Sequence, residues 1–185
     1  MPQTIDLIRH GQSTFNAHYA AHGTDPMLID ARLTPLGESQ AVALHQRFRH
    51  EKYDLVVASP LTRAIQTAER AFGDSHGKPL KIEVWHRERV ESSCDVGRPA
   101  SIMAAEFPHL DFGHLDEHWW AEGADNLGGG LWHEPEEHCI KRVAQFRDWI
   151  KKRPEQRIAV FGHATFFYHA SGIEMKNCDV VRWVP

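Results

Sequence analysis

The sequence predicts an α/β fold: a three-layer sandwich in which a mostly parallel central sheet carries helices on both faces. Two observations predict it. Short apolar runs typical of buried strands alternate along the chain with segments of helical periodicity. In two places a hydroxyl residue followed by proline, Thr34-Pro35 and Ser59-Pro60, marks the start of a helix.

The first strand is expected over residues 5–8, which form a short apolar run. A polar loop is expected to follow it, from Gly11 to about Leu33. The Thr34-Pro35 signal then opens a helix over 36–50, where apolar residues recur at helical spacing.

A second buried strand is expected over residues 55–58, all of which are apolar. The helix that begins at Ser59-Pro60 is expected to run to about Phe72, because Gly73 is a common residue just after a helix end. A third strand is expected over residues 80–85.

In the second half of the chain, a short helix over 101–107 is expected to stop before Pro108. The segment from about 108 to 134 is acidic and aromatic, and we expect it to be an irregular loop or lid. Its tryptophans are expected to pack against the protein, with a lid that shapes substrate choice as the alternative. An amphipathic helix over 136–152 follows.

The last elements are a strand over 157–161, a short helix after His163 and a strand over 180–184. No internal repeat and no interdomain linker interrupts the 185 residues, so we expect one domain over residues 1–185. In such sheets ligands sit beyond the carboxyl ends of the strands, and this is where the functional residues should lie.

The composition is that of an ordinary soluble globular protein, with 42% hydrophobic and 25% charged residues. The formal net charge of −4 indicates no nucleic-acid partner and no membrane partner. No apolar stretch approaches the ~18 residues of a membrane span, and no signal peptide is visible. Nothing in the pattern indicates an oligomeric state.

The charge is unevenly distributed, because residues 99–140 contain nine acids and no Lys or Arg. The rest of the chain contains the other 16 acids and all 21 Lys and Arg residues, so its formal net charge is +5. A basic body with an acidic segment fits a small anionic substrate held in a cleft. It fits a solvated loop on a slightly basic domain equally well.

The three cysteines, Cys94, Cys139 and Cys178, are odd in number and have no metal-binding or redox spacing. We expect them to be reduced thiols, which indicates a cytoplasmic protein.

Polar residues follow three of the expected strands at their carboxyl ends. The first strand leads into Arg9-His10-Gly11, the second into Ser59-Pro60 with Arg63 one turn further, and the fourth into Gly162-His163. If these strands are parallel neighbours, two histidines and two arginines meet at one edge of the sheet. Four such groups would repel one another when charged, so an anion should lie between them.

Several features indicate that this anion is a phosphoryl group. The helices expected after Ser59-Pro60 and after His163 point their free N–H groups at the same place, which favours negative charge. Arginine forks match phosphate oxygens two at a time. We therefore predict that His10, as a neutral imidazole, takes the phosphoryl group onto its own ring.

The other groups have predicted roles as well. Arg9, Arg63 and His163 could stabilise the charge on the transferred group without a metal. A leaving alkoxide needs a proton, and the end of the third strand delivers Glu88 as the first candidate acid, with Glu91 and Asp95 as rivals.

The residues also resemble the histidine phosphatase superfamily, the phosphoglycerate mutase-like proteins. Four blocks in the family's order carry the resemblance and cover most of the chain, namely residues 9–16 (RHGQSTFN), 33–41 (LTPLGESQA), 59–68 (SPLTRAIQTA) and 161–163 (FGH). The resemblance implies the phosphoglycerate mutase-like fold. It also implies a phosphohistidine on His10 and a phosphate pocket built from Arg9, Arg63 and His163.

The resemblance assigns two further side chains and one backbone contact. Asn16 would contact the transferred group or the substrate, and Glu88 would protonate the leaving group and then activate water. The family often has glycine after its second histidine, and here Ala164 stands there with its backbone N–H retained for the phosphate. Residues 87–99, with the run Glu88, Cys94, Asp95 and Gly97, look more like a less typical branch of the superfamily.

The mutases of the family are longer and enclose the site, so this short chain favours a phosphatase acting on a small phosphomonoester. A phosphoglycerate mutase and a non-catalytic phosphate-binding module are the alternatives. A metal-dependent hydrolase is a further alternative, because histidines and acids interleave in the acidic segment. However, residues 133–138 (HEPEEH) miss the zincin spacing and contain proline, so we expect no metal and no cofactor.

Overall fold

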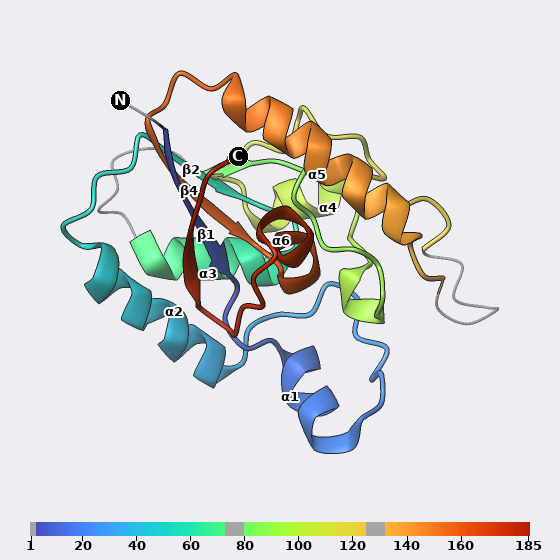
Figure 1. The fold of residues 1–185 in the computed structure, drawn as a ribbon. Coiled ribbons are helices and arrows are strands. Elements are labelled where there is room, and N and C mark those ends of the chain that lie inside the picture. The colour runs from blue at the N-terminus through green and yellow to red at the C-terminus, as the bar shows by residue number, and fades with distance from the viewer. Residues whose placement is uncertain (1–2, 73–79, 125–131) are drawn as a thin grey trace.

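A five-stranded sheet in the order β3-β2-β4-β1-β5 runs through the molecule (Figure 1). The computed structural model describes residues 3–72, 80–124 and 132–185, and the statements below concern these residues. The strands are β1 (Thr4–Arg9), β2 (Leu55–Ala58), β3 (Lys81–Ile82), β4 (Arg157–Gly162) and β5 (Val180–Trp183). The pairs β1·β4, β2·β4 and β2·β3 are parallel, and β5 lies antiparallel to β1 at one edge.

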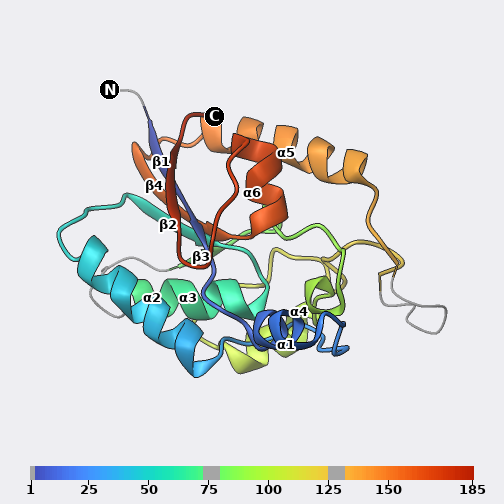
Figure 2. The ribbon, with the colours of Figure 1, turned by 60° about the horizontal axis from the view of Figure 1, so that its bottom comes forward.

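Helices cover both faces of the sheet, as Figure 2 shows. The helices α2 (Pro35–Phe48) and α3 (Thr62–Phe72) lie on one face, and α5 (Glu136–Lys151) and α6 (Ala164–Ser171) lie on the other. The mostly parallel three-layer α/β architecture expected from the sequence is therefore confirmed.

Alternation along the strands explains why each face is apolar. In β4, Ile158 and Val160 pack in the cluster with α5 and α6, whereas Ala159 and Phe161 pack in the cluster with α2 and α3. Both faces are buried, so the strand is a continuous apolar run. Phe161 is fully buried, and truncating such a side chain to alanine costs about 3–5 kcal/mol.

The helix α1 (Thr14–His22) occupies part of the segment for which a loop was expected, and this expectation is wrong. It lies beyond the carboxyl end of β1 (Figure 1). Ser13 and Asn16 form a reciprocal capping box that starts the helix, and Gly23 ends it with a positive φ of 67°. Phe15 is its one buried residue, so the helix has no apolar periodicity that a pattern analysis could detect.

Two other elements differ from the expected bounds. The strand β3 has two residues, because the chain leaves the sheet after the Glu83 N–H donates to the Ala58 carbonyl at 3.0 Å. The helix α3 begins at Thr62 rather than at Ser59-Pro60, since Asp30 accepts the Thr62 N–H at 2.7 Å from another segment. Gly73, expected to end this helix, lies outside the described residues.

The acidic segment packs its first tryptophan against the body of the protein. Trp119 is buried and donates its indole N–H to the Arg98 carbonyl at 2.8 Å. A Cβ at Gly97 would lie 2.5 Å from the Trp119 ring, so the glycine makes this packing possible. A short helix, α4 (Ala100–Glu106), precedes the segment as expected. Among the described residues, none of the helices has the length and apolar composition of a membrane span.

Candidate active site

The strand register brings the two predicted histidines together. Arg9 of β1 pairs with Gly162 of β4, so the next residues, His10 and His163, leave the sheet at the same level. Their ring centroids are 5.3 Å apart. The backbone N–H of His10 donates to the Gly162 carbonyl at 3.0 Å. Both rings are buried at the carboxyl edge of the sheet, where the sequence placed them.

The hydrogen bonds of His10 define which nitrogen can act as a nucleophile. Its Nδ1 lies 2.7 Å from the Gly11 carbonyl oxygen, and its Nε2 lies 3.2 Å from Nε of Arg63. The guanidinium can only donate, so Nε2 carries the lone pair and Nδ1 carries the proton. Burial, followed by the charges of Arg63 and Arg9, holds the pKa of His10 well below its ordinary value of 6.5. The ring is therefore a neutral imidazole at neutral pH.

Arg63 is the second residue of α3, and its guanidinium lies beside the His10 ring in the interior. Besides its contact with His10, its Nη1 donates to the Cys94 carbonyl and its Nη2 donates to Asp95 Oδ1 at 2.8 Å. Cys94 and Asp95 belong to the 3₁₀ turn η2 (Ser93–Asp95). This turn was not predicted to support Arg63.

Two buried polar atoms of the cluster lack a hydrogen-bond partner among the described residues, Nε of Arg9 and Nδ1 of His163. One further nitrogen of each side chain is engaged: Arg9 Nη1 donates to the Met175 carbonyl at 2.6 Å, and His163 Nε2 lies 2.8 Å from Ser59 Oγ. A buried donor without a partner costs about 1–3 kcal/mol. An anion lying against both atoms would satisfy them.

Glu88 closes the N-terminus of α6. Its carboxyl oxygens accept the N–H groups of Thr165 at 3.0 Å and Phe166 at 2.9 Å. Burial, and then the like charge of Asp95, raise the pKa of Glu88 to about 7, against the lowering effect of these N–H groups and of Arg63. The carboxyl therefore exists in both forms near neutral pH.

The helix ends are used differently from what the sequence indicated. Free N–H groups were expected at the starts of α3 and α6, but the protein's own carboxylates accept several of them. Asp30 takes the Thr62 N–H and Glu88 takes two at α6. The positive end of each helix thus faces an anion, as expected, but that anion is a side chain. At the start of α6, Ala164 N–H donates to no acceptor in the described part of the chain.

The predicted contact residue Asn16 lies near the cluster, but it also has a local role. Its Oδ1 accepts the Ser13 N–H at 3.2 Å as part of the capping box. Asn177, which the sequence analysis missed, donates from Nδ2 to the His10 carbonyl at 2.9 Å and to Asn16 Oδ1 at 3.4 Å. Asn177 therefore ties the chain after β1 to the segment before β5, and no sequence signal marks it.

The rival acids are held in other ways. Glu91 pairs with Arg89 at 3.0 Å and accepts the Thr165 hydroxyl at 3.1 Å, and 40% of its side chain is exposed. Asp95 is buried against Arg63. Among the described residues, Glu88 is thus the one of the three that is buried and whose carboxyl group has no cation in direct contact.

The histidines of the acidic segment are dispersed. His114 bonds to the Ile82 carbonyl, His118 stacks on Trp120, and His109 pairs with Glu69. Over residues 3–72, 80–124 and 132–185, no group of three or more His, Cys, Asp or Glu side chains is placed to hold a metal ion.

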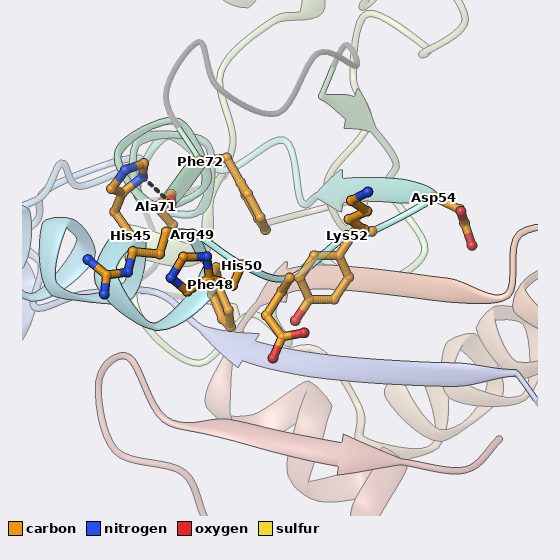
Figure 3. Close-up of a pocket in the computed structure, with 10 residues that line it drawn as sticks. His45, Phe48, Arg49, His50, Lys52, Asp54, Ala71 and Phe72 are labelled. Carbon is orange, nitrogen blue, oxygen red and sulfur yellow. Dashed lines mark hydrogen bonds between the residues drawn. The ribbon is translucent and has the colours of Figure 1, made fainter.

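A separate hollow lies at the other end of the sheet, where β2 begins (Figure 3). It is lined by the C-terminal ends of α2 and α3 and the connection to β2, and His50 and Lys52 are exposed there. It shares no residue with the cluster around His10, so its side chains provide remote controls for experiments on that cluster.

The fold and the cluster define an α/β protein with paired imidazoles and guanidiniums at the carboxyl edge of its sheet. A model of the histidine phosphatase superfamily (branch 1) matches residues 5–173, and the chain belongs to this superfamily.

Relatives and solved structures agree with this family. The chain is 28% identical, over 95% of its length and 76% of the relative's, to a phosphoglycerate mutase-like protein of Arabidopsis thaliana. Over 44% of the chain it is 38% identical to a glucosyl-3-phosphoglycerate phosphatase of Mycolicibacterium vanbaalenii, covering 34% of that protein. A structure of mycobacterial glucosyl-3-phosphoglycerate phosphatase complexed with VO3 has a TM-score of 0.61 at 18% identity, covering 97% of this chain and 92% of that one.

Proposed function

We propose that this chain is a metal-independent phosphatase that hydrolyses a small phosphomonoester through a phosphohistidine on His10. One observation carries the proposal: Nε2 of His10, the ring nitrogen with the lone pair, lies in a buried cluster formed with Arg63 and His163. A neutral imidazole in such a place can attack phosphorus.

In the first step, the lone pair of His10 Nε2 forms a bond to phosphorus while the ester P–O bond breaks on the opposite side. Arg63 Nε–H exchanges its 3.2 Å bond to the ring for a bond to a phosphoryl oxygen. Arg9 Nε–H and His163 Nδ1, both without partners among the described residues, bind the same group. Nδ1 carries the proton for this bond when the Ser59 hydroxyl donates to Nε2. The Ala164 N–H and the Asn16 side chain complete the proposed contacts with phosphate or substrate.

The leaving alkoxide takes its proton from Glu88, whose pKa of about 7 suits both giving and receiving a proton. In the second step the Glu88 carboxylate removes a proton from water. The water oxygen attacks phosphorus, the P–N bond breaks, and orthophosphate leaves. Glu88 and His10 return to their starting forms, so the cycle balances without a metal ion.

A phosphatase is favoured over a mutase because several relatives are named as phosphatases. Relatives that match 95% of the chain are named phosphoglycerate mutase-like, which makes a mutase the second candidate. The cytoplasmic setting and the single-domain organisation also stay predictions.

The test measures orthophosphate release from p-nitrophenyl phosphate, phosphoserine and 3-phosphoglycerate with a chelator present. His10→Ala should lower turnover by at least about 10⁴-fold, as expected for loss of a nucleophile. His50→Ala, an exposed histidine in the hollow of Figure 3, is the matched control and should keep wild-type activity. Equal activity of wild type and His10→Ala would end the proposal.

A second measurement distinguishes the two candidate activities. Interconversion of 2- and 3-phosphoglycerate, followed by ³¹P NMR with and without added bisphosphoglycerate, would assign the chain as a mutase if it exceeded hydrolysis. Phosphate binding without either reaction in wild type would instead identify a binding module.

A further inference from the structure

Asp95 lies directly behind the Arg63 guanidinium, and its own orientation is fixed by the backbone. Its Oδ2 accepts the N–H groups of Glu91 at 3.2 Å and Ser92 at 3.0 Å, inside the turn that ends at Asp95. Its Oδ1 accepts from Arg63 Nη2 at 2.8 Å, and the Cys94 thiol donates to the same oxygen at 3.5 Å. The two oxygens thus have separate tasks, one toward the turn and one toward the arginine.

The guanidinium is held at three points. Nη2 is bound by Asp95, Nη1 by the Cys94 carbonyl, and Nε faces Nε2 of His10. The side chains of Arg63 and Asp95 are 2% and 7% exposed, so solvent does not compete for these bonds. A planar group fixed on all three nitrogens cannot rotate away from the imidazole.

We propose that Asp95 is a positioning residue of the active site, which fixes the Arg63 guanidinium in the orientation needed beside the ring of His10. The inference rests on the proposed phosphoryl transfer. Asp95 would act through Arg63 and would not touch the substrate.

The charge of Asp95 has the opposite effect on binding from its effect on orientation. Phosphate is attracted to Arg63, and a carboxylate beside Arg63 reduces that attraction. If this position served only to increase phosphate affinity, a neutral side chain would therefore serve better than Asp95. Orientation is different, because misplacement of a transition-state contact by about 1 Å can cost about 10²-fold in rate.

Asparagine cannot reproduce both tasks of Asp95. If its oxygen faces Arg63, its NH₂ group meets the two backbone N–H donors, and if it is turned round, the NH₂ group meets the guanidinium. Asp95→Asn therefore keeps the size of the side chain but loses the hold on Arg63 or on the turn.

Asp95 also affects the proton on Glu88. Burial raises the pKa of Asp95, and Arg63 and the two backbone N–H groups oppose this rise. A charge on Asp95 disfavours a second charge on Glu88 and so raises the pKa of Glu88. Removing the charge should lower the pKa of Glu88. The charged and titratable groups that face Glu88 or its backbone from the surrounding elements are Arg9, Arg63, Arg87, Arg89, Glu91, Cys94, Asp95, Cys139 and Arg142.

The test compares wild type, Asp95→Asn, Arg63→Ala and the double variant, with Asp148→Asn on the exposed side of α5 as the matched control. Asp95→Asn should lower kcat by about 10–10²-fold with little change in KM. The high-pH fall in kcat/KM should also move to lower pH. In the Arg63→Ala background, Asp95→Asn should lower kcat little further, because the two residues act as one unit. The inference would be overturned if Asp95→Asn kept the wild-type kcat. It would also be overturned if Asp95→Asn lowered kcat as much in the Arg63→Ala background as it does in wild type.

A measurement without turnover separates this inference from the proposed function. The Arg63 Nε–H signal in a ¹H–¹⁵N spectrum, assigned by its loss in Arg63→Lys, should be protected from exchange in wild type and broadened in Asp95→Asn. An unchanged signal would refute the positioning role even in an inactive protein. Absence of turnover in wild type with the expected broadening would refute the proposed phosphatase and leave the role of Asp95 intact.

Discussion

Gly37 lies against the carbonyl of Gln12 so closely that a Cβ on Gly37 would be 2.0 Å from the carbonyl oxygen. The reciprocal contact is equally tight, since a Cβ on Gly11 would be 2.5 Å from the Gly37 oxygen. Thr34 N–H also donates to the Gln12 carbonyl at 2.9 Å. The first turn of α2 is thus in direct backbone contact with the residues that follow His10.

Gly37→Ala should therefore destabilise the protein and disturb the site, because backbone atoms must move to admit the methyl group. We expect a loss of about 1–3 kcal/mol in the free energy of unfolding, measured by denaturant titration, together with a lower kcat. Gly113→Ala is the control, since its Cβ would meet the end of the exposed Asp111 side chain, rather than backbone, at 3.3 Å. Equal stability of the two variants would contradict the backbone contact.

Glu88→Gln should affect substrates according to their leaving groups. A p-nitrophenolate leaves without a proton, whereas the alkoxide of 3-phosphoglycerate or phosphoserine needs one. We expect a loss of about 10²–10⁴-fold in kcat for the alkyl phosphates and a much smaller loss for p-nitrophenyl phosphate. Glu91→Gln should show no such split. A split in Glu91→Gln and none in Glu88→Gln would reassign the acid.

The pH dependence should follow the same carboxyl. Glu88 must be protonated to start the reaction, and its pKa is about 7, so kcat/KM for an alkyl phosphate should fall as the pH rises above that value. His10 must be neutral, and its pKa lies well below 6.5, so activity should persist below pH 6.5. An optimum on the alkaline side of pH 8 in rate profiles would contradict these assignments.

A buried ion network next to the Glu88 backbone should contribute to the free energy of unfolding. Glu134 is 1% exposed, and its carboxylate binds Arg87 at 2.9 Å and Arg142 at 3.1 Å. Both arginines also donate to the Glu88 carbonyl. Glu134→Ala should cost about 3–5 kcal/mol of unfolding free energy, because two buried cations lose their counter-charge.

The sign of the pH effect on that network follows from the pKa of Glu134. Hydrogen bonds from Arg87 and the charges of both arginines lower this pKa against the effect of burial. Its contribution is therefore present above the ordinary carboxyl pKa and is lost as the pH falls through the lowered value. The difference in Tm between wild type and Glu134→Gln should shrink below about pH 4. A difference independent of pH would show that charge is not its cause.

The edge that carries His10 and His163 could be predicted because parallel strands have fixed register and end together. Apolar runs revealed the strands, and the residues after them were then necessarily neighbours. Arg63 was expected at this edge because it lies one turn after the second strand, and the family resemblance implied the same phosphate-binding role. Its position in α3 agrees with a place at this edge.

The remaining features depend on pairings that leave no local pattern. The capping box of α1 replaces the apolar periodicity by which helices are detected, so the helix was missed. Asp30 and Glu88 reach helix ends 32 and 77 residues away. A sequence shows that a helix N-terminus attracts anions, but it does not show which acidic side chain of the folded protein binds there.

The carboxyl at the start of α6 links proton uptake to the backbone. A negative charge at a helix N-terminus is stabilised by about 0.3–1 kcal/mol, an attraction that vanishes when Glu88 is protonated. Fraying of the first turn must then vary with pH. Hydrogen exchange at the amides of Thr165 and Phe166 therefore reports the titration of a buried acid in the resting protein, with no substrate added.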